Sequence, residues 1–168
     1  MSTMNGKKGI IMGVANERSI AWGIAKILAS NGAELAFSYQ NEGFMKRLIP
    51  LMTSIKSDKS FECDVSKSSS ELNSIEYMFE KISKIWNEVD FVVHALAYSD
   101  KEELKGKYVN CSRENFLNSL DISAFSFTRV AKSALPLMSS NGGSLLTLSY
   151  LGAERTTPNY NVMGVAKS

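Results

Sequence analysis

The fold is decided by residues 9–40, which are GIIMGVANERSIAWGIAKILASNGAELAFSYQ. This stretch opens with a short apolar run, residues 9–14, and closes with a second one, GAELAFSYQ, at residues 32–40. Between them, residues 20–31 carry apolar side chains at helical spacing and end at Asn31-Gly32, a common helix stop signal. A strand, a helix and a second strand in this order are typical of a parallel sheet with crossover helices.

The same alternation continues to the end of the chain. Further strands are predicted at 60–64, 89–97 and 144–150, and further helices at 44–53, broken or bent near Pro50, at 72–86 after a capping serine cluster, and at 113–138. The pattern predicts an α/β fold with a doubly wound, Rossmann-like parallel sheet. Because the chain stops in the first turns of another helix, we expect residues 1–168 to be a single dinucleotide-binding domain that is incomplete at its C-terminus.

Composition excludes several classes of partner. The 168 residues include 19 Lys and Arg against 17 Asp and Glu, so no broad charge attracts nucleic acid or an anionic membrane. The first residues do not resemble a charged leader followed by an apolar core, and no apolar run approaches roughly 20 residues, so we expect neither export nor membrane insertion. The two cysteines, Cys63 and Cys111, are too few for a disulfide framework. We therefore expect a cytoplasmic protein with reduced thiols and no metal site.

The first strand-to-helix turn is a candidate phosphate-binding loop. Helix N-terminal amides and the helix dipole stabilise a pyrophosphate, while Gly13 and Gly23 permit close backbone approach and close helix packing. Ser19 offers a hydroxyl to a phosphate or to the helix N-terminus. The GxGxxG fingerprint is absent, since the spacing is G-x5-S-x3-G, so a plain turn with a capping serine remains an alternative.

Residues at the ends of the next two strands favour a nicotinamide dinucleotide. Gln40 stands where an acidic residue commonly binds the ribose hydroxyls of NAD, and it provides no cation for a 2′-phosphate. NADH is favoured over NADPH, although Lys46 and Arg47 keep the question open. The Asp64 carboxylate can accept from the adenine amino group and Val65 can cover the ring, but an Asp that only caps the next helix is an equal alternative.

The end of the chain offers candidate catalytic groups. Tyr160 and Lys167 are seven residues apart, which on one helix places them on the same face, roughly 10 Å apart along the axis. The ammonium can bind the nicotinamide ribose and favour anionic character on the phenol, which can donate to a developing oxyanion. Tyr150 ends the last strand. The alternative is a packed tyrosine and a solvated lysine, and His94 is interpreted as a hydrogen-bonded strand-end histidine rather than a base.

These stretches together resemble one known family. GVANERSIAWGIA, SYQNE, the Asp64-Val65 pair and LSYLGAERTTPNYNVMGVAK are similar to the type I bacterial enoyl-acyl-carrier-protein reductases, a divergent branch of the short-chain dehydrogenase/reductase family with a Y-x9-Y-x6-K motif. The resemblance covers almost all of the chain. It implies NADH-dependent reduction of the trans-2 double bond of an enoyl thioester on acyl carrier protein, and a homotetramer. It also implies a seven-stranded sheet, whose last strands and substrate-pocket helices this chain does not contain.

The resemblance also implies residue roles. Tyr160 would stabilise the enolate oxygen, Lys167 would hold the ribose, and Tyr150 would assist at the substrate. The cofactor would be lined by Gly13, Ser19, Ile20, Gln40, Asp64, Val65, Leu96 and Lys167, and Ser99 would touch the substrate. Two rivals remain: a carbonyl-reducing relative, which would need Y-x3-K where position 164 is Gly, and a dinucleotide-binding scaffold without catalysis.

Overall fold

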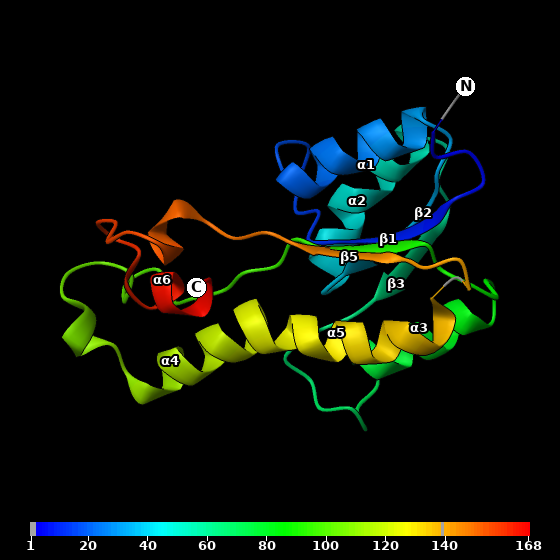
Figure 1. The fold of residues 1–168 in the computed structure, drawn as a ribbon. Helices are drawn as coiled ribbons and strands as arrows, with labels where there is room; N and C mark the ends of the chain where they lie inside the picture. The colour runs from blue at the N-terminus through cyan, green and yellow to red at the C-terminus, as the bar shows by residue number, and fades with distance from the viewer. Residues whose placement is uncertain (1–2, 139) are drawn as a thin grey trace.

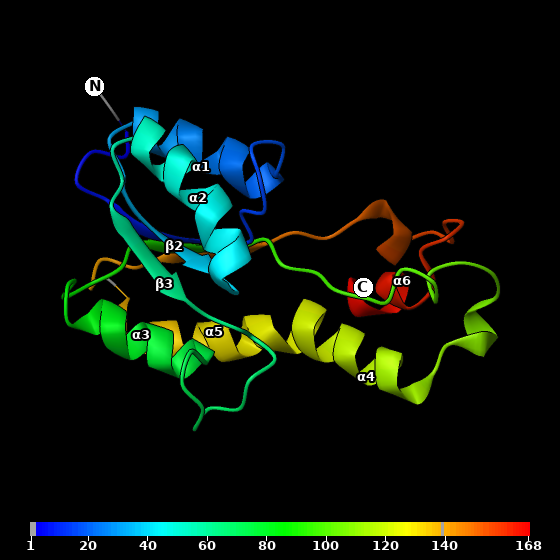
Figure 2. The ribbon, with the colours of Figure 1, turned by 180° about the vertical axis from the view of Figure 1, so that it is seen from behind.

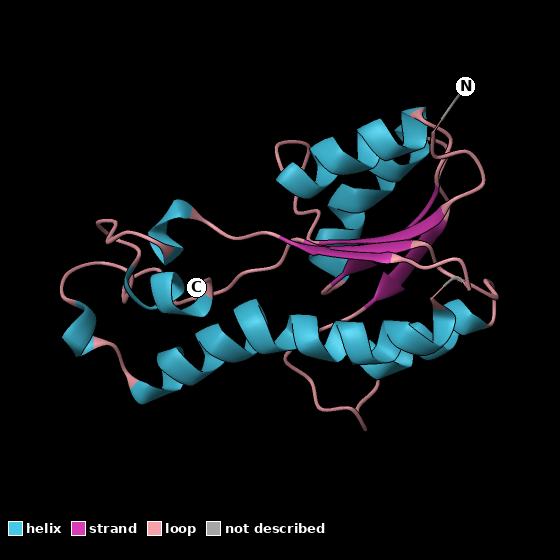
Figure 3. Ribbon diagram, in the orientation of Figure 1, coloured by secondary structure: helices cyan, strands magenta, loops and turns pink. Residues whose placement is uncertain are grey.

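The computed structural model describes residues 3–138 and 140–168, and within these ranges five parallel strands form one sheet in the order β3-β2-β1-β4-β5 (Figures 1 and 3). The strands are β1 (Lys8–Met12), β2 (Glu34–Tyr39), β3 (Lys59–Glu62), β4 (Phe91–His94) and β5 (Ser144–Thr147). The predicted doubly wound parallel sheet is therefore confirmed.

Strand β1 lies at the centre of the sheet. Ile11 pairs with Phe37 of β2 on one side and with Val93 of β4 on the other. Successive residues of β1 are fully buried, because both faces of the sheet are covered by helices, and this explains the continuous apolar run in the sequence. The strand order reverses direction at β1, and such switch points are where doubly wound folds bind ligands.

Helices cover both faces of the sheet (Figures 1 and 2). The pair on one face is α1 (Ile20–Ser30) and α2 (Glu42–Ser54), and those on the other are α3 (Ile75–Ser83), α4 (Arg113–Leu120) and α5 (Ser126–Ala134). Each face has its own apolar core, one around Phe37 and Leu48 and one around Ile75 and Val92. Helices α4 and α5 form one rod that runs past the carboxyl ends of the strands to α6 (Asn161–Ala166).

The sequence predicted one continuous α-helix over residues 113–138, but the rod that begins at Arg113 is not a uniform α-helix. A π-helical segment, Asp121–Phe125, separates α4 from α5, and a 3₁₀ turn, Leu135–Leu137, follows α5. Such segments disturb the regular carbonyl-to-amide pattern and recur at functional sites. The polar side chains Asn115, Ser119, Ser123 and Ser126 are all buried along this rod.

The predicted start of the helix at residue 72 was wrong. Helix α3 begins at Ile75 and not at residue 72, because Ser74 is its N-cap and accepts a hydrogen bond from the amide of Tyr77. The serine cluster forms a separate turn, in which Ser68 donates to the Glu71 carboxylate. Pro50 lies inside α2 without interrupting it.

Strand β5 lies at the edge of the sheet and pairs with β4 alone. Its two leucines, Leu145 and Leu146, are 39% and 45% exposed, although the sequence pattern is that of a buried strand. Among the helices of residues 3–138 and 140–168, none combines the length and apolar character needed to cross a membrane.

Candidate functional site

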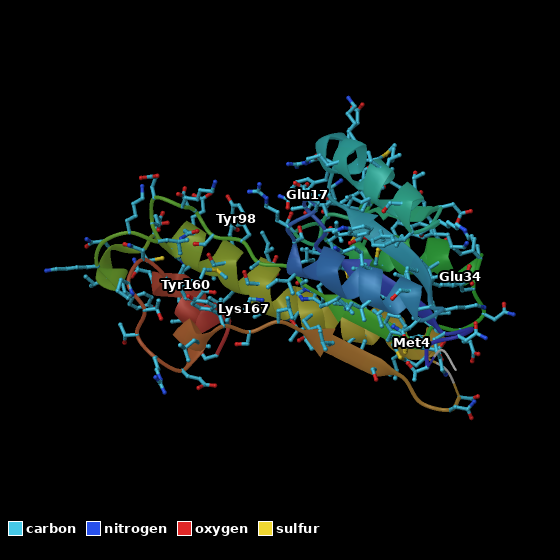
Figure 4. The ribbon with its side chains drawn as sticks, turned by 90° about the horizontal axis from the view of Figure 1, so that it is seen from above. Met4, Glu17, Glu34, Tyr98, Tyr160 and Lys167 are labelled. Carbon is cyan, nitrogen blue, oxygen red and sulfur yellow. The ribbon has the colours of Figure 1, made fainter. Side chains whose placement is uncertain are left out.

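The carboxyl ends of the strands surround a cavity of about 420 Å³. It is lined by the turn after β1, the ends of β2 and β3, the segment after β4 and Ile122 of the π-helical segment. Five of the predicted cofactor residues line it: Gly13, Gln40, Asp64, Val65 and Leu96. Seen from above, Tyr98, Tyr160 and Lys167 lie toward this end of the molecule, opposite Glu34 at the start of β2 (Figure 4).

Gly13 brings the turn after β1 against the end of β4. Its φ is +101°, and a Cβ at this position would lie 2.1 Å from the carbonyl oxygen of Ala95. Only glycine satisfies both constraints. The second glycine of the predicted motif behaves differently, since a Cβ at Gly23 would meet nothing within 4 Å, and the predicted close helix packing there is not observed.

Ser19 shapes the turn from within. Its Oγ accepts hydrogen bonds from the amides of Ala15 and Asn16, at 3.0 Å each, and it makes no side-chain cap bond to α1. Ile20 begins α1 with its side chain 67% exposed. Neither residue lines the cavity, so their predicted contact with a cofactor stays a prediction.

Gln40 and Asp64 meet at the far end of the cavity. The Gln40 amide donates to the Asp64 carboxylate at 3.3 Å, and the amide and hydroxyl of Ser66 donate to the other carboxylate oxygen. Burial alone would raise the pKa of Asp64, but these hydrogen bonds outweigh it and hold the pKa below its usual value. Asp64 is therefore an anionic acceptor at neutral pH, and it bonds the loop rather than capping a helix.

Cys63 also lines the cavity, a position that was not predicted from the sequence. It is 5% exposed. Burial, followed by the charge of Asp64, raises the pKa of its thiol to about 12. The thiol is thus protonated, and it contributes an apolar surface rather than a nucleophile.

Lys167 is fixed by two backbone carbonyls. Its Nζ donates to the oxygen of Leu96 at 2.9 Å, just after β4, and to the oxygen of Ser123 at 2.8 Å, within the π-helical segment. Burial lowers the pKa of Lys167 from its ordinary value. The ammonium is held where the cavity wall at Leu96 meets the rod, a position that local sequence could not reveal.

Tyr150 and Tyr160 form a stacked pair. Their ring centroids are 4.4 Å apart and the planes are tilted by 43°. Tyr160 precedes α6 as its N-cap and Lys167 follows as its C-cap, so the prediction that both lie within one helix was wrong. The predicted lowering of the Tyr160 pKa is also contradicted, because burial, and then the neighbouring Tyr150, raise that pKa.

Helix α6 packs too closely on the segment after Tyr150 for any side chain at position 164. A Cβ at Gly164 would lie 2.7 Å from the carbonyl oxygen of Gly152, and a Cβ at Gly152 would lie 2.5 Å from the Tyr160 ring. A lysine at 164 would collide with this backbone. The structure thus gives a physical reason for the absence of the Y-x3-K arrangement of carbonyl-reducing relatives.

Ser99 lies outside the cavity lining and belongs to a polar network on α4. Its Oγ donates to the Asn115 side chain at 3.2 Å, and the amide of Asp100 donates to the same oxygen. Ser123 bonds the residue before Ser99: its Oγ accepts from the amide of Tyr98 and donates to the carbonyl of Tyr98. The sequence missed Asn115 and Ser123, and their spacing of eight residues along one helix was the available signal.

His94 is buried and satisfied on both ring nitrogens. Nε2 lies 2.8 Å from Ser126 Oγ and Nδ1 lies 3.2 Å from Thr147 Oγ1. This confirms the interpretation of a hydrogen-bonded histidine, although the sequence had shown no serine partner for it.

We expect His94 to make stability pH-dependent. Burial, and then the charge of Lys167, lower its pKa from 6.5 to about 4. Between these values the unfolded chain binds the proton and the folded one does not, so the free energy of unfolding falls as pH drops from about 6.5 to 4, by about 3 kcal/mol. Urea unfolding across this range, with His94→Gln as the control that lacks this component, measures it. Equal slopes for both proteins would contradict the assignment.

The comparison with known proteins agrees with this geometry. Residues 13–168 match the family model described as enoyl-(acyl carrier protein) reductase. The chain belongs to this family. The enoyl-[acyl-carrier-protein] reductase [NADH] 2 of Rhizobium meliloti (strain 1021), a member of the family by name, is 54% identical over 165 residues, which are 98% of this chain.

Solved structures of enoyl-acyl-carrier-protein reductases share the fold. FabI from Candidatus Liberibacter asiaticus superposes with a TM-score of 0.94 at 50% identity over 99% of this chain and 63% of that one. The enzyme from Anaplasma phagocytophilum, solved in complex with NAD, gives a TM-score of 0.92 at 54% identity over 98% of this chain and 61% of that one. The chain spans about 60% of the length of the Rhizobium meliloti relative.

Proposed function

We propose that the protein reduces the trans-2 double bond of an enoyl thioester carried on acyl carrier protein, with NADH as reductant. One observation carries the proposal: a fixed ammonium, Lys167, lies beside the strand-end cavity, and the stacked phenols Tyr150 and Tyr160 adjoin the same short helix. The relatives named above, which are NADH-dependent enoyl reductases, support it. The reaction would complete a cycle of fatty-acid elongation.

The residues of the cavity fit a dinucleotide. One end presents the acceptor Asp64 and the amide Gln40 to a base and a ribose, and Lys167 presents an ammonium beside Leu96. Within the described ranges, no three His, Cys, Asp or Glu side chains gather to hold a metal ion. When bound, NADH would supply the hydride for the β carbon of the enoyl group.

Tyr160 acts on the oxygen of the thioester. As that oxygen becomes negative, the phenol donates a hydrogen bond to it, and the raised pKa keeps the phenol protonated and able to donate at neutral pH. Lys167 holds the ribose, and its contacts with the Leu96 and Ser123 carbonyls restrict its ammonium to one place. Ser99 lies on the substrate side in this proposal.

The test is a spectroscopic assay of the full-length protein. NADH is mixed with a crotonyl thioester of acyl carrier protein, and the nicotinamide absorbance is followed. Loss of absorbance only when all three components are present supports the proposal. Binding of NADH without turnover would instead support a scaffold, and turnover of simple ketones would support a carbonyl reductase.

Gln40 is proposed to set the preference for NADH. Replacing Gln40 with Arg places a cation beside the ribose, next to Asp64, and offers it to a 2′-phosphate. We expect the ratio of kcat/KM for NADPH to that for NADH to rise about tenfold or more. Steady-state kinetics with both cofactors measure this ratio. A Gln40→Met variant separates the loss of the amide from the gain of charge, and an unchanged ratio in Gln40→Arg would contradict the proposed role.

The remaining features of the protein follow from the same proposal. Residues 1–168 would form one dinucleotide-binding domain whose open edge, β5, is completed by later strands. Cytoplasmic location fits the proposed substrate. A homotetramer fits the exposed apolar side chains on the rod, where Leu117, Phe125 and Leu135 are 46%, 55% and 72% exposed.

A further inference from the structure

One arginine joins three separate segments behind the cavity. Arg129, on α5, donates from Nη2 and Nε to the carboxylate of Glu76 on α3, at 2.8 and 3.3 Å. Its Nη1 donates to the backbone carbonyl of Val65 at 3.0 Å. The side chains of Arg129 and Glu76 are only 13% and 33% exposed, so solvent screens this pair far less than the exposed pairs elsewhere on the surface.

The electrostatics of the pair agree with its geometry. Burial alone would raise the pKa of Glu76, but the hydrogen bond and charge of Arg129 outweigh burial and hold that pKa below its usual value. Glu76 is therefore ionised at neutral pH and fixes the plane of the guanidinium. A planar group held in this way has a fixed orientation, and it directs one N–H of Nη1 toward the Val65 oxygen.

The Val65 carbonyl belongs to the loop that forms one end of the cavity. The loop is tied to the sheet by the Cys63 amide, which donates to the Tyr39 oxygen, and to the chain before α3 by the Asp64 amide, which donates to the Asn73 oxygen. The Gln40 side chain adds a bond to the Asp64 carboxylate, and the Val65 side chain is buried in the core. The guanidinium supplies the hydrogen bond to the Val65 carbonyl and so ties this loop to α5. Val65 and Asp64 both line the cavity, so a shift of this carbonyl moves the cavity wall.

The same rod reaches the opposite end of the site. Ser123, in the π-helical segment, accepts from Lys167 through its carbonyl, and Arg129 stands six residues further along the continuous helix. The rod therefore contacts the Lys167 ammonium at one point and the Asp64-Val65 loop at another. Its length sets the distance between these two ends.

We propose that Arg129, oriented by Glu76, is a positioning residue that fixes the Asp64-Val65 loop at the correct distance from Lys167 and so sets the affinity for the adenosine half of the dinucleotide. The inference rests on the proposed function, because it assumes that the cavity binds NADH. Arg129 does not itself line the cavity, and it contacts a lining residue through its hydrogen bond to the Val65 carbonyl, so we infer that its effect reaches the cofactor through the loop.

The experiment uses the full-length protein and three variants of the bridge. Arg129→Met removes the guanidinium, Arg129→Lys keeps the charge but cannot span both partners, and Glu76→Gln keeps the shape while weakening the orientation. Lys84→Met is the matched control, since it breaks an exposed Glu80–Lys84 pair on α3. Calorimetry gives Kd for NADH, ADP-ribose and reduced nicotinamide mononucleotide, steady-state kinetics give KM and kcat, and thermal melts give Tm.

In Arg129→Met we expect Kd for NADH and ADP-ribose, and KM for NADH, to rise about tenfold. Kd for reduced nicotinamide mononucleotide, and kcat at saturating NADH, should stay within about twofold. Arg129→Lys and Glu76→Gln should be intermediate, and Lys84→Met unchanged.

Two results would overturn the inference. One is a lower Tm in Arg129→Met and Glu76→Gln with an unaltered Kd for ADP-ribose, which indicates a purely structural bridge. The other is an equal loss of affinity for ADP-ribose and for the mononucleotide. Failure of the unaltered protein to bind NADH would overturn the proposed function itself, and is distinguished from both because it needs no variant.

Discussion

Replacing Tyr160 with Phe is expected to lower kcat for a crotonyl thioester by about 10²- to 10³-fold, as the loss of one donor to a developing oxyanion does. The ring keeps its packing against Tyr150, 4.4 Å away between centroids, so the fold and the affinity for NADH should not change. The expected pattern is a loss of kcat at constant Kd for NADH. Stopped-flow single turnover, together with NADH titration, measures both quantities.

The matched control for this prediction is Tyr150→Phe. Tyr150 has the same stacking partner but is 49% exposed, and its hydroxyl is assigned only an assisting role. Its kcat should fall by less than that of Tyr160→Phe. If Tyr150→Phe is the more damaging of the two, the roles of the phenols are reversed, and if neither lowers kcat, the oxyanion assignment fails.

Replacing Gly13 with Ala is expected to destabilise the fold by about 3 kcal/mol and to weaken NADH binding more than tenfold. The added Cβ would lie 2.1 Å from the Ala95 oxygen, and the φ of +101° disfavours any residue with a side chain. To remove this steric clash, the turn after β1 and the end of β4 must move apart, and both segments line the cavity. Thermal melts and NADH titration give the two effects.

Gly23→Ala is the matched control for stability. Gly23 lies in the interior of α1, where a Cβ would meet nothing within 4 Å, so alanine should stabilise the helix by about 0.5–1 kcal/mol. We therefore expect Gly13→Ala to lower the free energy of unfolding and Gly23→Ala to raise it. A Gly13→Ala protein with an unchanged melting temperature and an unchanged Kd would show that the turn is free to move.

Local sequence carried most of the fold. Apolar runs predicted the buried strands β1, β2 and β4, because a strand buried on both faces is apolar throughout. The less buried strands β3 and β5 were also predicted, β3 from a weaker pattern. The predicted strand 89–97 was longer than β4, because the chain leaves the sheet after His94 to form the cavity wall. The π-helical segment could not be predicted, because apolar spacing over a long helix does not register one extra residue in a turn.

The site was predicted less completely, and for a physical reason. Strand ends and the first turn were placed correctly at the cavity, because parallel strands bring their carboxyl ends to one edge. The carbonyl groups that fix Lys167 belong to Leu96 and Ser123, which lie 71 and 44 positions earlier in the chain, and no local sequence pattern indicates such contacts. The contact between Arg129 and Glu76, which are 53 residues apart, could not be predicted for the same reason. The catalytic roles remain predictions.

The strand order β3-β2-β1-β4-β5 also dictates when the molecule can assemble. β1 can pair with β2 early in synthesis, but its other neighbour, β4, emerges about 80 residues later. At translation rates of about 5–20 residues per second, one side of this largely apolar strand stays unpaired for on the order of ten seconds. During this time the nascent chain exposes the unpaired backbone edge of residues 9–12, where another chain could pair and aggregate.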